Sequence, residues 1–156
     1  MWVPLLVAGG GALALCALGG LSTPIGPWYR DLRKPSLQPP NWLFGPAWTL
    51  ILGLAAWSAA IAWTAAPDHA TRVKVLILFG TNALFHALWS PLFFRARRPD
   101  WALIEVPFLW GSLVALVVGL WPISREASAL ILPYLAWVSF ASWLNHAIVR
   151  LNRPFA

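Results

Sequence analysis

An amide, an imidazole and an indole occur together in one apolar stretch of the chain. Asn82, His86 and Trp89 stand at i, i+4 and i+7, and this spacing places them on one face of a helix. Such groups can hydrogen-bond a ligand and stack on a flat ring. Two structural interpretations stay open, because Asn82 can join two helices and His86 can be a satisfied interior histidine.

A second face of the same kind follows later in the chain. Trp137, Ala141 and Asn145 stand at i, i+4 and i+8, with Phe140 beside them, and again share one side of a helix. Asn145 has the same two interpretations as Asn82: it can contact a ligand or hydrogen-bond a neighbouring helix.

A third aromatic face comes from an earlier apolar stretch, where Trp48 and Leu52 point the same way. Polar side chains are costly in lipid, so the polar members of these faces should turn toward the interior of a helix bundle. Three aromatic faces with a few polar groups predict a pocket for a flat apolar ligand.

The usual signatures of catalysis and metal binding do not occur in the sequence. There is no nucleophile–histidine–acid set, phosphate-binding glycine loop or dinucleotide fingerprint. His69, His86 and His146 lack metal-ligand spacing. The single cysteine, Cys16, excludes an intramolecular disulfide and a cysteine-based metal site. We therefore expect no metal and no required cofactor.

Composition places these faces in a membrane. Apolar residues make up 60% of the 156 residues and charged residues 10%, whereas soluble domains carry about 25% charged residues. The net charge of +6 does not indicate nucleic-acid binding, because the basic residues lie in short runs between apolar segments. We predict an all-α integral membrane protein whose non-protein neighbour is lipid.

The apolar runs predict one domain, residues 1–156, with five transmembrane helices. Their expected ranges are residues 2–22, 44–66, 73–95, 101–121 and 127–150. Residues 24–43 form a long loop whose prolines and basic residues oppose a regular membrane helix, but whose large aromatic rings are too many for a solvated linker. This loop should cap the pocket. Glu105 should pair with Arg97 or Arg98, or reach the interface.

Basic residues predict the orientation of the bundle. Eight Lys and Arg residues fall on one side and three on the other if the five segments alternate. Cytoplasmic loops carry the excess of basic residues. We therefore expect the N-terminus outside, and the long loop and the C-terminus in the cytoplasm.

A set of motifs in fixed order resembles one known family. They are Trp28-Tyr29, Leu32, Lys34-Pro35, Pro39-Pro40, Trp42, Trp48, the run Trp89 to Phe94, the run Pro133 to Trp137, Phe140-Ala141 and Leu144-Asn145. The chain resembles the tryptophan-rich sensory protein/translocator protein (TspO/MBR) family, also called the peripheral benzodiazepine receptor family. The resemblance implies a five-helix bundle, usually a homodimer, that binds porphyrins and in some members sterols or benzodiazepine-type drugs.

The resemblance also implies which residues surround the ligand. By position these are Tyr29, Pro40, Trp42, Trp48, Leu52, Asn82, His86, Trp89, Trp137 and Ala141. Two departures matter. Many members have Asn where this chain has His86, and the sterol motif of animal members needs a Tyr that is missing before Arg150.

These observations favour a receptor, sensor or carrier that binds a porphyrin such as protoporphyrin IX or haem, rather than an enzyme. Arg30, Arg33 and Lys34 would meet the propionates. The alternative is an enzyme that degrades porphyrin in light, with Trp48 and Trp137 as catalytic residues. A small-solute transporter is a weaker alternative, because no inverted repeat is present.

Assembly is predicted from small residues at helical spacing. Ala83 and Ala87 form a small-xxx-small pair, and Ala55 and Ala59 form another. Such pairs permit close helix contact in a membrane. We expect a homodimer, with the pair at Ala83 as the seam.

Overall fold

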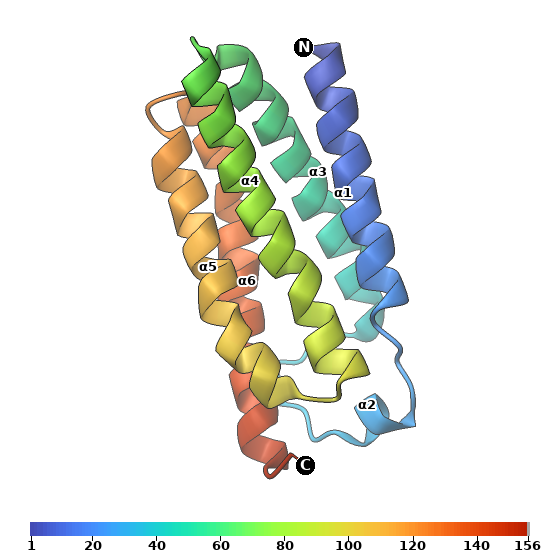
Figure 1. The fold of residues 1–156 in the computed structure, drawn as a ribbon. Coiled ribbons are helices and arrows are strands. Elements are labelled where there is room, and N and C mark those ends of the chain that lie inside the picture. The colour runs from blue at the N-terminus through green and yellow to red at the C-terminus, as the bar shows by residue number, and fades with distance from the viewer. Residues whose placement is uncertain (156) are drawn as a thin grey trace.

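The chain folds into a bundle of long helices with one short helix in a loop (Figure 1). The computed structural model describes residues 1–155. Its elements are α1 (Trp2–Leu21), α2 (Pro27–Asp31), α3 (Asn41–Ala65), α4 (His69–Ser90), the π-helical turn η1 (Pro91–Arg95), α5 (Pro99–Leu120) and α6 (Arg125–Asn152). Within residues 1–155 no strand is present. Five helices are long and apolar enough to cross a membrane, which confirms the expected fold class.

The long helices run alongside one another, and the two ends of the bundle differ. Figure 1 shows the N-terminus at one end, and α2, the α4–α5 connection and the C-terminus at the other. The most extensive helix pairs are α5 with α6, α1 with α3, α4 with α5 and α3 with α6. Helix α1 packs chiefly on α3 and contains no fully buried residue. It therefore forms the loosest wall of the bundle.

Local chemistry explains where the helices begin. The Asp68 carboxylate accepts from the backbone N–H of Thr71 (2.7 Å) and caps α4. This hydrogen bond lowers the pKa of the Asp68 carboxyl. The Ser124 hydroxyl oxygen accepts from the N–H of Ala127 (3.2 Å) and caps α6. Capping side chains of this kind stabilise a helix start by about 1 kcal/mol.

The helix bounds differ from the expected ones by a few residues. Helix α3 begins at Asn41 rather than residue 44, and α4 begins at His69 rather than residue 73. The cap at Asp68 extends α4 across its basic first turns. The expected loop also contains α2, which starts at Pro27, where a proline costs no helical hydrogen bond.

The expectation for Glu105 was wrong. Arg98 instead binds Asp100 through two hydrogen bonds of 2.8 and 2.5 Å. Glu105 is buried, and among residues 1–155 neither of its carboxylate oxygens has a hydrogen-bond partner. Its position one turn further along α5 turns the side chain into the bundle instead of toward the basic end.

Candidate functional site

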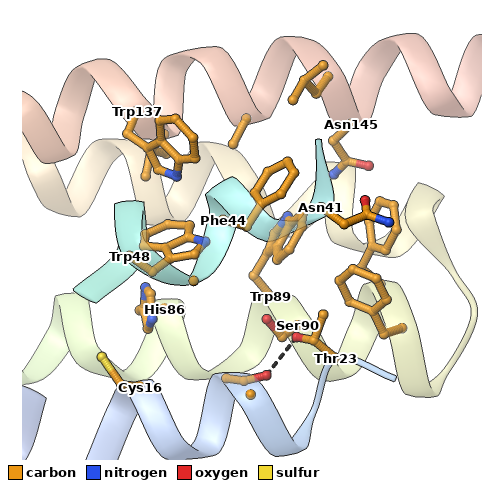
Figure 2. Close-up of a pocket in the computed structure, with 18 of the residues that line it drawn as sticks. Cys16, Thr23, Asn41, Phe44, Trp48, His86, Trp89, Ser90, Trp137 and Asn145 are labelled. Carbon is orange, nitrogen blue, oxygen red and sulfur yellow. Dashed lines mark hydrogen bonds between the residues drawn. The ribbon is translucent and has the colours of Figure 1, made fainter. Parts of the chain in front are cut away.

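A cavity of about 350 Å³ lies inside the bundle at the end covered by the loop (Figure 2). This volume is in the range of small-molecule sites. Its walls come from all five long helices, η1 and the loop, and include Leu15, Cys16, Gly19, Gln38, Phe44, Val106, Leu109 and Val138. Of the described residues that line it, none is Asp, Glu, Lys or Arg. The cavity therefore suits an uncharged, largely apolar body.

Aromatic rings form one wall of the cavity, centred on Trp48 of α3. The ring of Trp48 meets His86 at 4.9 Å between centroids, Tyr134 at 6.0 Å and Trp137 at 6.2 Å, each nearly edge to face. Phe44, one turn earlier in α3, packs against Trp137 at 5.9 Å. Edge-to-face pairs of this kind fix ring orientation. Rigid ring faces and edges are therefore presented to whatever fills the cavity.

Some residues that line the cavity carry buried polar atoms without partners. The indole Nε1 atoms of Trp89 and Trp137 and the amide Oε1 of Gln38 are buried, and none has a hydrogen-bond partner within residues 1–155. A buried donor or acceptor left unsatisfied costs about 1–3 kcal/mol. A bound molecule can use these two donors and one acceptor only when their side chains turn toward the cavity.

His86 projects from α4 toward Trp48 and carries a hydrogen bond on one ring nitrogen (Figure 2). Its Nδ1 lies 2.8 Å from the hydroxyl of Tyr134 on α6. Tyr134 is fully buried. The hydrogen bond joins α4 to α6 and holds the imidazole in one orientation beside the cavity.

The loop is held over the cavity by its own contacts. Tyr29 is buried against Phe93 and Phe94, with ring centroids 6.5 and 5.3 Å away. The Gln38 amide donates to the Tyr29 hydroxyl (3.1 Å). Burial raises the pKa of the Tyr29 phenol. The loop is thus packed on the bundle, as the aromatic content of this segment predicted.

Hydrogen bonds in the middle of the loop and just before it tie this region to the bundle. The Arg33 N–H donates to Asn152 Oδ1 (2.8 Å), and Asn152 Nδ2 donates to the Arg33 carbonyl (2.8 Å). Arg95 donates from Nη2 to the carbonyl of Leu21 (3.0 Å), which joins the end of η1 to the end of α1. The loop is therefore fixed to α6, and α1 to η1.

The basic residues of the loop do not reach the cavity. Lys34 Nζ donates to the carbonyls of Tyr29 (2.6 Å) and Leu32 (3.1 Å) and lies 4.4 Å from the Tyr29 ring centroid. Arg30 and Arg33 are exposed. Partial burial lowers the pKa of the Lys34 ammonium group. Lys34 orders the loop, and propionate contact by these three residues has no support in this conformation.

Most of the expected site residues are brought together. Tyr29, Trp48, Leu52, His86, Trp89, Trp137, Ala141 and Asn145 line the cavity. They come from the loop and from α3, α4 and α6. Residues that are far apart in the sequence therefore meet where the three aromatic faces predicted a pocket.

Four expected residues, Pro40, Trp42, Asn82 and Phe140, lie outside the lining. Pro40 is exposed just before α3, and Trp42, in the first turn of α3, is 72% exposed. Asn82 is buried, and its Nδ2 donates to the Ser112 hydroxyl oxygen on α5 (3.0 Å). Asn82 therefore joins two helices, which is one of its two interpretations.

Phe140 and Asn145 lie at different angular positions around α6, and their contacts differ accordingly. Phe140 stacks on Trp143 at 6.1 Å with nearly parallel planes, and Trp143 is exposed. Asn145 lines the cavity, and in the amide orientation that satisfies both groups it donates to the Pro99 carbonyl (3.0 Å) and accepts from the Leu103 N–H (3.1 Å). Asn145 therefore also ties α6 to the first turn of α5.

Sequence reasoning missed the contribution of α1 and of two loop-side residues. Cys16 and Thr23 line the cavity, as do Gln38 and Phe44. The Thr23 hydroxyl donates to the Gly19 carbonyl (2.6 Å; dashed in Figure 2), so its polar group is satisfied within the chain. Helix α1 is uniformly apolar, so its cavity face carries no pattern. The polar residue Gln38 among prolines was the one usable signal.

Comparison with known proteins gives one family. The sequence model described as the TspO/MBR family matches residues 3–151. The tryptophan-rich protein TspO of Archaeoglobus fulgidus is 42% identical over 125 residues, 80% of each chain. The translocator protein of Homo sapiens is 32% identical over 126 residues, 80% of this chain and 75% of that one. The protein CrtK of Rhodobacter capsulatus is 35% identical over 136 residues, 87% and 84%.

Proposed function

Because this chain belongs to the TspO/MBR family, we propose that it is a membrane receptor or sensor that binds a porphyrin in the cavity under the loop. It is a multi-pass integral membrane protein. Family membership supports the receptor or sensor role. The choice of a porphyrin as ligand rests on the chemistry of the cavity wall.

The observation that carries the proposal is the composition of the cavity wall. Trp48, Trp137 and Phe44 supply rigid ring surface, and the lining residues of the described chain carry no formal charge. Flat aromatic ligands gain about 0.5–1.5 kcal/mol per aromatic contact beyond area burial. A porphyrin core is a flat apolar ring of this kind.

Three lining residues can give the ligand an orientation. Trp89, Trp137 and Gln38 lie in the lining, and their two indole N–H groups and one amide oxygen have no partner within residues 1–155, so a small turn of each side chain offers them to a ligand. A few polar groups placed in an apolar site are what fix a ligand's orientation in protein pockets. A porphyrin offers acceptors on its carboxyl groups and, when metal-free, N–H donors at its centre.

Filling the cavity from the inside tests the proposal. Ala141 lines the cavity on α6, while Ala136 on the same helix is exposed. In lipid nanodiscs, Ala141→Trp should lower the affinity for metal-free protoporphyrin IX at least about tenfold, the effect of losing 1.4 kcal/mol. Ala136→Trp is the matched control and should bind as wild type does. Equal binding by both variants would place the ligand elsewhere.

Light-dependent degradation of the porphyrin in the same cavity is the second candidate function. The observation that favours it is the contact between Trp48 and Trp137, whose rings lie 6.2 Å apart beside the ligand space. Indoles are readily oxidised side chains. Absorbance of the porphyrin complex, held dark and then illuminated, separates simple binding from breakdown.

A further inference from the structure

His86 has one ring nitrogen anchored and the other free. Nδ1 is hydrogen-bonded to the Tyr134 hydroxyl at 2.8 Å. Within residues 1–155, Nε2 has no hydrogen-bond partner and is not among the buried atoms that lack one. Since His86 lines the cavity, its Nε2 is the ring atom that remains available there.

A histidine with one ring nitrogen anchored can bind a metal through the other. A ligating histidine almost always uses its second ring nitrogen for a hydrogen bond, which fixes the tautomer and the ring orientation. The Tyr134 hydroxyl can accept from Nδ1–H, and this tautomer leaves the Nε2 lone pair free. Trp48, edge to face with the imidazole at 4.9 Å, limits its rotation further.

The rest of the cavity decides what kind of metal centre fits. Within residues 1–155, no group of three or more His, Cys, Asp or Glu side chains is placed to hold an ion by itself. A single protein ligand is enough only when the metal brings its other ligands with it, as the iron of a porphyrin does. A porphyrin core holding a divalent metal is also uncharged, which matches a lining without formal charge.

We propose that the cavity takes a metalloporphyrin, with Nε2 of His86 as the axial ligand of its metal and Tyr134 as the residue that positions the imidazole. This inference rests on the proposed porphyrin-binding function and deepens it. Porphyrin binding alone requires only the ring surfaces of Trp48 and Trp137. The inference adds a coordinate bond that metal-free porphyrin cannot form.

Cys16 also lines the cavity, and a cysteine thiolate is a known ligand of haem iron. It projects from α1, and Figure 2 shows it near the end of the cavity where His86 lies. A thiolate and an imidazole give different electronic spectra on haem iron, because the thiolate donates more electron density. Variants at both positions therefore identify the ligand directly.

The test compares two porphyrins in nanodiscs of one lipid composition. Wild type, His86→Asn, Cys16→Ser and Tyr134→Phe are each titrated with iron protoporphyrin IX, as Fe(III) and after reduction to Fe(II), and with metal-free protoporphyrin IX. The wild-type iron complex should show imidazole ligation by absorbance and electron paramagnetic resonance. His86→Asn should lose this signature, and its ratio of iron-porphyrin to metal-free affinity should fall at least about tenfold, the lower bound for losing even an outer-shell partner.

The other variants and a rescue complete the design. Cys16→Ser should keep the imidazole signature. Tyr134→Phe should keep ligation but shift the spectrum, since the hydrogen bond to Nδ1 tunes ligand basicity. His86→Gly should regain the signature when free imidazole is added. This rescue covers the case in which the Asn variant fails to fold.

The other possible results would contradict either the axial role of His86 or the proposed porphyrin binding. An unchanged iron spectrum and affinity ratio in His86→Asn, or no rescue of a folded His86→Gly, would overturn the axial role. A thiolate spectrum in wild type that is lost only in Cys16→Ser would assign the thiolate instead and overturn the axial role of His86. Metal-free porphyrin bound by wild type without any coordination of the iron form would overturn this inference and leave the proposed function standing. Failure of wild type to bind either porphyrin would overturn both.

Discussion

Trp48 of α3 and Trp137 of α6 meet inside the bundle with their ring centroids 6.2 Å apart and their planes at 87°. This perpendicular contact directs the edge of one indole at the face of the other and leaves ring surface of both residues on the cavity wall. It joins two residues that lie more than half the chain apart in the sequence. The site therefore depends on the packing of α3 against α6 as much as on the residues themselves.

Light should separate the two candidate functions through Trp137. Replacing it in Trp137→Phe keeps a ring in the wall, so porphyrin affinity should fall less than in Trp137→Ala. Phenylalanine is much harder to oxidise than tryptophan. If the protein degrades porphyrin, Trp137→Phe should bind it yet lose most of the light-driven bleaching followed by absorbance.

Simple binding predicts the opposite result in the same experiment. Wild type and Trp137→Phe would then bleach the ligand at the same slow rate. A dark sample of each protein is the control for spontaneous loss of porphyrin. Fast bleaching by wild type alone would establish the enzyme interpretation.

Asn82 should matter for stability and not for the ligand. Its amide donates to the Ser112 hydroxyl oxygen at 3.0 Å and does not line the cavity. Interhelical hydrogen bonds in membrane proteins contribute about 0.6 kcal/mol on average and up to about 1.7 kcal/mol. Asn82→Ala should lower the free energy of unfolding in mixed micelles by about this amount, with porphyrin affinity unchanged.

A double-mutant cycle with Ser112→Ala checks the cause. If the hydrogen bond accounts for the effect, the two substitutions should be non-additive by the energy of the bond. A tenfold loss of porphyrin affinity in Asn82→Ala would instead show that Asn82 contacts the ligand, as the family resemblance implied.

The sequence predicted the helices well because long apolar runs are separated by short runs that contain charged residues. Arg95, Arg97 and Arg98, for example, separate two apolar runs, and helices lie on either side of them. Apolar length alone is enough to identify a membrane span. For α4 the missing information was the cap by Asp68, whereas α3 begins at Asn41 without a side-chain cap.

The sequence was less informative about which side of a helix faces which neighbour. Asn82 and His86 are one turn apart on α4, offset by about 40° around the helix axis. That offset, together with the difference in height, turns Asn82 to Ser112 and His86 to Tyr134. Which neighbour each side chain contacts depends on how the helices cross. The periodicity of a single helix carries no information about this crossing. The cavity face of α1 was invisible because that helix is apolar all round.

The Lys and Arg residues at one end of the bundle predict its orientation in the membrane. The α2 segment, the α4–α5 connection and the C-terminus lie at one end of the bundle (Figure 1). Eight of the eleven Lys and Arg residues belong to these segments: Arg30, Arg33, Lys34, Arg95, Arg97, Arg98, Arg150 and Arg153. We propose that this end is cytoplasmic, with the N-terminus outside.

Site-directed labelling measures this orientation. Ser36 is exposed in the loop. In a Cys16→Ser background, Ser36→Cys should react with a membrane-impermeant maleimide only in inside-out vesicles. Labelling in right-side-out vesicles would reverse the orientation.

We also propose a homodimer whose seam is on α4. Ala83 and Ala87 are partly exposed, and Gly80 on the same helix has nothing within 4 Å of its would-be Cβ. Small residues allow close approach of a second helix in lipid. Ala83→Leu should shift the protein toward monomer in detergent, as measured by light scattering. Ala59→Leu on α3 tests the other small-residue pair, and an effect there alone would move the seam.

Porphyrin titration of the two indole variants tests the central claim most directly. Trp48→Ala and Trp137→Ala each remove a stacking surface and buried apolar area from the cavity. Together these losses should weaken metal-free protoporphyrin IX binding by roughly 10- to 100-fold. Quenching of tryptophan fluorescence in nanodiscs measures the affinity, and Trp2→Phe, at a residue that is 79% exposed, is the control. Wild-type affinity in both alanine variants would contradict the assignment of the ligand to this cavity.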